Sequence, residues 1–120
     1  MEDRFSRAER LEARCSQFGI EVIMLCKSLK LHHLNSTIIN QLIRAATSIG
    51  ANYMEANGAS SRKDFKNKIF ICKKEAKECR HWLLMLIQLH PEEKVKIDQL
   101  NQEAQELTLI FSKICGSLSK

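Results

Sequence analysis

Residues 39–56, INQLIRAATSIGANYMEA, place apolar side chains at intervals that alternate between three and four residues. The positions are Ile39, Leu42, Ala46, Ile49, Tyr53 and Ala56. An α-helix brings residues three and four apart onto one face, so the stretch predicts an amphipathic helix. Continued over several turns, this spacing is typical of helices that pack nearly parallel or antiparallel in a bundle.

Three further segments show the same alternation. Its positions are Leu11, Cys15, Phe18, Val22, Leu25 and Leu29 in the first, then Phe65, Ile69, Cys72, Ala76, Cys79, Leu83 and Leu86, and finally Ile97, Leu100, Ala104, Leu107, Phe111, Ile114 and Leu118. Only four glycines and one proline occur in 120 residues, which favours long helices over a sheet with many turns. The sequence therefore predicts one all-α domain, residues 1–120, folded as an antiparallel up-down-up-down four-helix bundle.

The expected helix boundaries fall between these segments. Ser36 is expected to cap the second helix, and Gly58 to end it. Ser61 and Asp64 have the spacing of a capping box at the start of the third helix. Pro91 follows His90 and is expected near the start of the fourth helix.

Composition excludes several classes of protein. No run of about 18 apolar residues is present, so no membrane span is expected, and the charged first residues do not resemble a signal peptide. Five scattered cysteines do not form a disulfide framework. We expect a cytoplasmic protein with reduced thiols and no membrane association.

The second and third predicted helices carry a further face outside their apolar seams. It comprises Arg44, Ser48, Asn52 and Glu55 on one helix and Ile71, Glu75, Glu78 and Trp82 on the other, and these eight residues are called the assembly face below. On the second helix the outward side chains are mostly small, which permits close approach of another backbone. We interpret this face as the subunit interface of a homo-oligomer. The alternative is that the core of a single bundle is wide enough to cover these residues.

The positive charge is concentrated in one segment. Residues 61–90 contain eight basic and three acidic side chains, a net charge of +5 that equals the net charge of the whole chain. Five of the basic residues project within about 60° of one another on a helical wheel. These are Arg62, Lys66, Lys73, Lys77 and Arg80, called the basic ridge below, and Phe70 lies beside them. Such a ridge suits a nucleic-acid backbone, whereas the alternative is an ordinary solvated lysine-rich face.

The sequence contains no convincing catalytic or metal-binding motif. Glu78 and His81 match the Glu-x-x-His element of di-iron bundles, but those sites need two such elements and two more glutamates. Both residues also lie off the apolar seam. We expect no metal, no cofactor and no enzymatic activity, and a metal enzyme is the weakest alternative.

Two stretches resemble a known family. Residues 41–56 are similar to the signature of the bacterial four helix bundle proteins, Arg-x-x-x-Ser-Ile-x-Ala-Asn-x-x-Glu, which places Arg44, Ser48, Asn52 and Glu55 at the signature positions. Residues 68–83 are similar to the family's third helix, with Lys-Glu-Ala-x-Glu followed by Trp-Leu. The family includes proteins encoded in intervening sequences of large-subunit ribosomal RNA genes. The accessory variability determinant of diversity-generating retroelements is a relative.

The resemblance extends over about residues 7–118 and implies a ring-shaped homopentamer of basic bundles. In the retroelement relatives the assembly partners a reverse transcriptase and binds nucleic acid. The leading hypothesis is thus a non-enzymatic, homopentameric binder of RNA or DNA that contacts phosphates through the basic ridge and has a possible reverse-transcriptase partner. The alternative is a protein-interaction scaffold with no nucleic-acid role.

Overall fold

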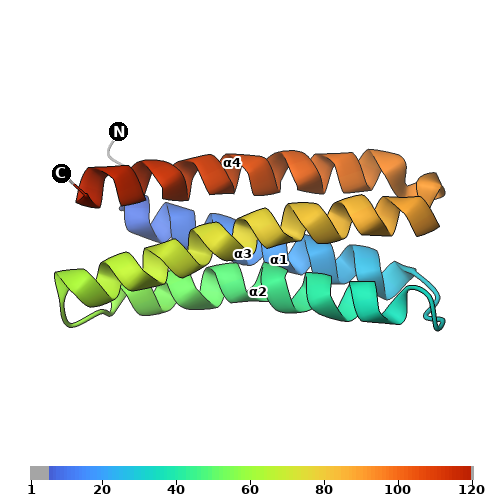
Figure 1. Ribbon diagram of the computed structural model, residues 1–120, viewed down its shortest axis with the longest axis horizontal. Coiled ribbons are helices and arrows are strands. Elements are labelled where there is room, and N and C mark those ends of the chain that lie inside the picture. The colour runs from blue at the N-terminus through green and yellow to red at the C-terminus, as the bar shows by residue number, and fades with distance from the viewer. Residues whose placement is uncertain (1–5, 120) are drawn as a thin grey trace.

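Four antiparallel helices make up the part of the protein that the computed structural model describes, residues 6–119. They are α1 (Arg7–Ser28), α2 (Ser36–Asn57), α3 (Arg62–Leu89) and α4 (Lys94–Leu118), with a short 3-10 helix, η1 (Pro91–Glu93), before α4. Consecutive helices run in opposite directions, so α1 begins and α4 ends at the same end of the molecule (Figure 1). The predicted up-down-up-down four-helix bundle is confirmed.

The core follows the predicted seams. Twenty-three buried apolar side chains from the four helices form one cluster, which includes all six positions of residues 39–56 that define the second seam. At the bundle ends the seam residues Leu11, Phe65 and Ile114 are only half-buried against this cluster. Gly19 and Gly50 lie where α1 meets α2, and a Cβ atom on Gly50 would stand 3.6 Å from the backbone of Cys15. A Cβ atom at either position would be in ordinary van der Waals contact with the other helix, so both glycines lie at the α1–α2 interface.

The expected helix boundaries at Gly58 and Ser61 are confirmed, whereas the start of α2 differs from the expectation. Ser36 is the first residue of α2, and Asn35 occupies the capping position, so the prediction that Ser36 caps this helix is wrong. Asn35 does not cap α2 with its side chain; it is fully buried and hydrogen-bonds to the backbone of the α1–α2 loop instead. The Asn35 side chain therefore hydrogen-bonds to the preceding loop instead of to the first backbone N–H groups of α2.

The other termini use local capping. Gly58 ends α2, and the Asp64 backbone N–H donates to Ser61 Oγ at 3.0 Å at the start of α3. A full capping box between Ser6 and Glu9, which we did not predict, opens α1. Pro91 begins η1 rather than α4 itself.

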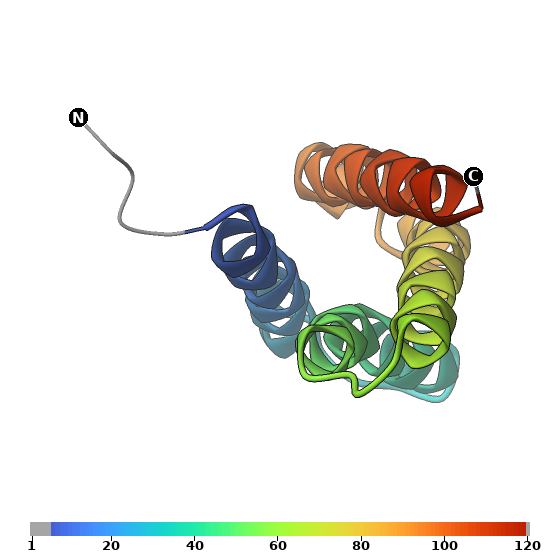
Figure 2. The ribbon, with the colours of Figure 1, turned by 90° about the vertical axis from the view of Figure 1, so that its left-hand side faces the viewer.

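The bundle is not equally closed on all sides. From the end that carries the start of α1 and the end of α4, the helices trace an open arc in which α2 and α3 lie between α1 and α4 (Figure 2). The α1–α4 pair makes far fewer contacts than the pairs that are consecutive in the chain. Three ion pairs within residues 6–119 join α1 to α4: Arg14 pairs with Glu103 and with Glu106, and Lys96 pairs with Glu21. One of the four seams of the bundle is therefore partly open.

Candidate nucleic-acid interface and assembly face

The basic ridge lies along the edge where α3 meets α4. Lys66 and Lys73 line a hollow of about 410 Å³ together with Phe70 and residues of the last turns of α4. Farther along α3, Lys77 and Arg80 line a second hollow of about 410 Å³, whose α4 wall is Asn101. Four of the five cations that the sequence places on one side of a helix therefore border a shallow, interrupted groove between two helices.

The ridge residues differ in how they are held. Arg62 donates to the Leu118 carbonyl at 3.2 Å, and Arg80 Nε donates to Asn101 Oδ1 at 3.3 Å, so both guanidinium groups are tied to α4. Within residues 6–119, Lys66, Lys73 and Lys77 take part in no ion pair. Three ammonium groups of the ridge are thus available to an external anion.

Apolar side chains accompany these cations. Phe70 is 60% exposed and shares a hollow with Lys66 and Lys73, and Leu84, 56% exposed, lies beside Lys77 and Arg80. An exposed aromatic ring between cations is the arrangement with which proteins stack a nucleic-acid base while they hold its backbone. The sequence indicated Phe70, but it gave no sign that α4 would supply the opposite wall.

The assembly face is held together by ion pairs within one chain. Arg44 Nη1 donates to Glu75 Oε2 at 3.0 Å, and Arg44 Nη2 contacts Glu78. Trp82 Nε1 donates to the same carboxylate of Glu78 at 2.9 Å. These contacts join α2 to α3, so four of the eight residues form one network across the seam between the two helices.

Of the remaining residues of the face, Ser48 and Asn52 contact each other within α2, and Glu55 pairs with Lys68 of α3. Asn52 Nδ2 donates to the carbonyl and the hydroxyl of Ser48, both at 2.9 Å, and Lys68 donates to Glu55 at 2.8 Å. Ile71 and Trp82 are half-buried. The core of one bundle therefore covers part of this face, while Arg44 and Glu55 remain exposed.

Glu75 is the exceptional residue of the network. Its side chain is only 6% exposed, and its Oε1 atom is buried with no hydrogen-bond partner among the described residues. Most buried carboxylate oxygens accept at least one hydrogen bond, because an unpaired buried acceptor costs free energy. The sequence indicated an outward position for Glu75, whereas the structure places it inside, beneath the Arg44 guanidinium.

The network also changes the acidity of Glu78. Burial alone would raise the pKa of this carboxyl, but hydrogen bonds from Trp82 and Arg44 and the charge of Arg44 outweigh it and hold the pKa below the ordinary value of 4.5. The carboxylate form is therefore favoured near neutral pH, and Arg44 remains paired.

No group of three or more histidine, cysteine, aspartate or glutamate side chains in residues 6–119 is arranged to hold a metal ion. Within the same residues, no helix is long and apolar enough to cross a bilayer. Four of the five cysteines are buried, and Cys115 is half-buried.

Two tertiary features of the structure were also not predicted. One is the contact between Asn35 and His90, which joins residues 55 positions apart. The other is an apolar groove between α1 and α4, in which half-buried seam residues meet arginines of α1. The sequence analysis assigned Leu11, Ile114 and Leu118 to the core. The arginines beside Leu11 on α1 were the one feature of the sequence that could have indicated a groove there.

The fold and its surfaces define a class of protein: an up-down four-helix bundle with a basic groove on one seam and an ionic network on the next. The model of the 23S rRNA-intervening sequence protein family matches residues 11–113, and the chain belongs to this family.

A solved structure supports the assignment. It is the crystal structure of a protein of unknown function from the S23 ribosomal protein family of Bacteroides thetaiotaomicron, which is 32% identical in sequence with a TM-score of 0.79. The match covers 87% of this chain and 96% of the other. No curated protein matches the chain.

Proposed function

We propose that this protein is a non-enzymatic, homo-oligomeric RNA- or DNA-binding bundle that acts in the cytoplasm and contacts phosphates through the basic ridge. The observation that carries the proposal is that Lys66, Lys73 and Lys77 take part in no ion pair within residues 6–119, and that two of them, Lys66 and Lys73, share a hollow with the exposed ring of Phe70. Unpaired cations release counterions from a phosphate backbone on binding, whereas cations already paired with carboxylates release few.

The dimensions of the ridge support a polymeric ligand. From Arg62 to Arg80 the helix rises about 27 Å, which exceeds the length of a single nucleotide several times. The ridge offers no residue set that distinguishes base edges, so recognition rests on the backbone and on shape. Structured RNA is the first ligand to test, because the family is named for an intervening sequence of ribosomal RNA.

Assembly through the assembly face is the second part of the proposal. The half-buried apolar side chains of Ile71 and Trp82 support it, because a neighbouring copy would cover them. Ala51 is exposed among the small residues of α2 and leaves room for that neighbour. The homopentamer is the assembly that the resemblance to the bacterial four helix bundle proteins implies.

The binding experiment uses labelled structured RNA, duplex DNA and single-stranded DNA, each at low and physiological salt. We expect affinity to fall steeply with salt for at least one ligand, and the triple change of Lys66, Lys73 and Lys77 to Glu to abolish binding. Since each phosphate contact contributes nearly one unit to the salt slope, loss of three contacts lowers the slope by about three.

The matched control changes three cations outside the ridge, Lys27, Lys30 and Lys94, to Glu. This control has the same net charge and should keep most of the affinity. Equal loss in the two variants, or no binding to any ligand by the wild-type protein, would reject the proposal.

Assembly is tested separately by sedimentation. Ala51→Arg places a long side chain on the outer surface of α2 and should lower the mass of the oligomer. Gln105→Arg, at an exposed position of α4, should leave this mass unchanged. A monomeric wild-type protein, or equal masses for all three proteins, would contradict the assembly part alone.

A protein-interaction scaffold is the second candidate function. The same half-buried Ile71 and Trp82 favour it, since a different polypeptide, such as a reverse transcriptase, would cover them as well as a second copy would. Retention of a protein partner after nuclease treatment, together with no salt-sensitive nucleic-acid binding, would favour this function.

A further inference from the structure

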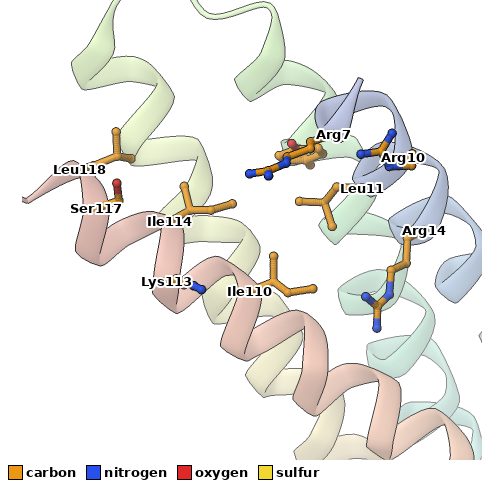
Figure 3. A pocket seen from close by; sticks show the side chains of 10 residues that line it. Arg7, Arg10, Leu11, Arg14, Ile110, Lys113, Ile114, Ser117 and Leu118 are labelled. Carbon is orange, nitrogen blue, oxygen red and sulfur yellow. The ribbon is translucent and has the colours of Figure 1, made fainter. Parts of the chain in front are cut away.

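An open groove separates α1 from α4 at the end of the bundle where α1 begins and α4 ends. It has a volume of about 580 Å³, and its apolar lining comes from Leu11, Tyr53, Ile110, Ile114 and Leu118. Leu11 on α1 and Ile110 and Ile114 on α4 point toward one another across the gap (Figure 3). This site is called the terminal groove below.

The apolar lining of the terminal groove is accessible. Leu11, Ile110, Ile114 and Leu118 are all half-buried, although Leu11, Ile114 and Leu118 continue the seams that are fully buried farther along α1 and α4. Tyr53 of α2 is buried beneath them. The seam residues of two helices therefore meet at this end without the close packing that buries them elsewhere.

Among the described residues, the charged lining of the groove is entirely positive. Arg7, Arg10, Arg14 and Lys113 line it, and no acidic side chain of residues 6–119 does. Arg14 is held by Glu103 at 2.6 Å and by Glu106 at 2.8 Å, and thereby joins the two walls. Arg7 and Lys113 are exposed on opposite walls and have no ion pair within residues 6–119.

We propose that the terminal groove binds an acidic amphipathic helix of a partner protein. The apolar face of such a helix would cover Leu11, Ile110 and Ile114, and flanking carboxylates would pair with Arg7 and Lys113. Helices commonly bind grooves of this kind through anchors spaced three and four residues apart. The charge complementarity selects an acidic partner over a basic one.

The dimensions of the groove fit a helix. Its α1 wall extends from Arg7 to Arg14, about 10 Å, and its α4 wall from Ile110 to Leu118, about 12 Å, so that roughly two turns of a bound helix would be in contact. The groove is open to solvent, whereas sites for small molecules enclose most of their ligand. An elongated partner that covers the groove from outside suits this shape.

The terminal groove is separate from the basic ridge. The ridge hollow uses Ser112, Cys115 and Gly116 of α4 and Ser119 just after it, and the groove uses other residues of the same helix turns. The two sites therefore lie on different faces of α4, and the inference goes beyond the proposed function.

The test uses a labelled helical peptide of about 14 residues, which spans about 20 Å, with leucines spaced three and four apart and glutamates on both flanks. Its binding to the full chain is measured by fluorescence anisotropy, and its position by changes in the backbone amide NMR spectrum. We expect changes in α1 and α4 around the groove. The double variant Arg7→Glu, Lys113→Glu should weaken binding by about tenfold or more.

Two controls make this result specific. The double variant Lys27→Glu, Lys30→Glu has the same change in net charge at the opposite end of α1 and should leave affinity within about twofold. A peptide in which lysine replaces every glutamate should bind at least about tenfold more weakly to the wild-type protein. Ile110→Ser, with an unchanged circular dichroism spectrum, should also weaken binding.

Several results would overturn the proposal. They are no binding of the glutamate peptide, equal loss in both double variants, or amide changes confined to α3. Binding of palmitate without binding of the peptide would instead assign the groove to a small amphipathic anion. Protection of the groove amides by a second copy of the chain, with no response to the peptide, would assign it to self-association.

Discussion

Asn35 joins two corners of the bundle that are distant in sequence. Its Oδ1 atom accepts from the His32 backbone N–H at 2.9 Å, and its Nδ2 atom donates to the Lys30 carbonyl at 3.0 Å. These two contacts fix the orientation of the amide, so Nδ2 must also be the donor to His90 Nε2, 3.0 Å away. The proton of neutral His90 then lies on Nδ1, which donates to Glu92 at 3.0 Å.

Asn35→Ala tests how much the hydrogen bonds of Asn35 contribute to the stability of the fold. It removes hydrogen bonds from three buried or half-buried groups, and we expect the free energy of unfolding to fall by about 2–3 kcal/mol. Urea denaturation measures the change. Asn40→Ala, on the exposed surface of α2, is the control and should cost less than about 0.5 kcal/mol. Similar values for the two variants would show that the buried contact contributes little.

Glu78 gives the protein a defined response to acid. Because hydrogen bonds from Trp82 and Arg44 hold its pKa below 4.5 in the folded state, its contribution to stability is fully present above that pH and is lost as the pH falls through the folded value. Glu78→Gln should therefore destabilise the protein by about 1 kcal/mol at pH 7, and the difference should shrink toward pH 3.

The Arg44→Met background provides the control for Glu78. Without the guanidinium, Glu78→Gln should have a smaller effect at pH 7 and a weaker dependence on pH. Denaturation of the four proteins at several pH values measures this coupling. An effect of Glu78→Gln that does not change between pH 7 and pH 3 would exclude the carboxylate as its source.

At the level of helices, the heptad positions predicted which residues are buried, and the structure confirms most of them. Ile49, Leu83 and Phe111 are fully buried, as their spacing requires. Spacing within one helix does not reveal how tightly two helices close, so the same pattern assigned Leu11 and Ile114 to a closed core. Their half-burial arises from the divergence of α1 and α4, which depends on packing among all four helices.

Polar residues were harder to place than apolar ones. Asn35 and Glu75 are buried through partners in other helices, and a sequence alone does not show such partners. The helical wheel placed the cations of the basic ridge on one side of α3, and in the structure four of them line the two hollows between α3 and α4. Whether these cations bind nucleic acid stays a prediction, as does assembly through the assembly face.

The weak α1–α4 seam predicts unequal stability among the helices. Arg14 bridges both helices through Glu103 and Glu106, and these carboxylates raise the pKa of Arg14 further above its ordinary value despite partial burial. Arg14→Met should accelerate amide hydrogen exchange in α1 by about fivefold or more, with a smaller effect in α2 and α3. Mass spectrometry of the exchanged protein resolves the helices.

Arg62→Met is the matched control for Arg14, since Arg62 contacts only a terminal carbonyl of α4 among the bonds described. It should leave exchange in α1 unchanged. Equal acceleration in all four helices of the Arg14 variant would indicate global destabilisation and would contradict local opening of the seam.

At the scale of the whole molecule, the reaction rates of the cysteine thiols show how often the bundle opens. Burial raises the pKa of Cys15 and Cys72 to about 12 and that of Cys26 to about 11, and it raises the pKa of Cys79 as well. Thiolates are the reactive form, so these four residues should react slowly at neutral pH. Half-buried Cys115 should react first.

A titration with Ellman's reagent measures this difference. We expect one fast equivalent in the native protein and five in denaturant, with the fast phase absent from Cys115→Ser. Several fast equivalents in the native protein would show that the core opens readily. Fast reaction that persists in Cys115→Ser would assign the accessible thiol to another cysteine.

The order of the helices has a consequence for how the chain folds. Each helix packs chiefly on the one that precedes or follows it, and α1 and α4, which are neighbours in space but most distant in sequence, contact each other much less. Such a chain has a low contact order, and helical domains of this kind fold in microseconds to milliseconds. A ribosome adds only about 5–20 residues per second, so each helix has time to pack on its predecessor before the next is made. The bundle can thus assemble stepwise during translation, with no need to wait for its last helix.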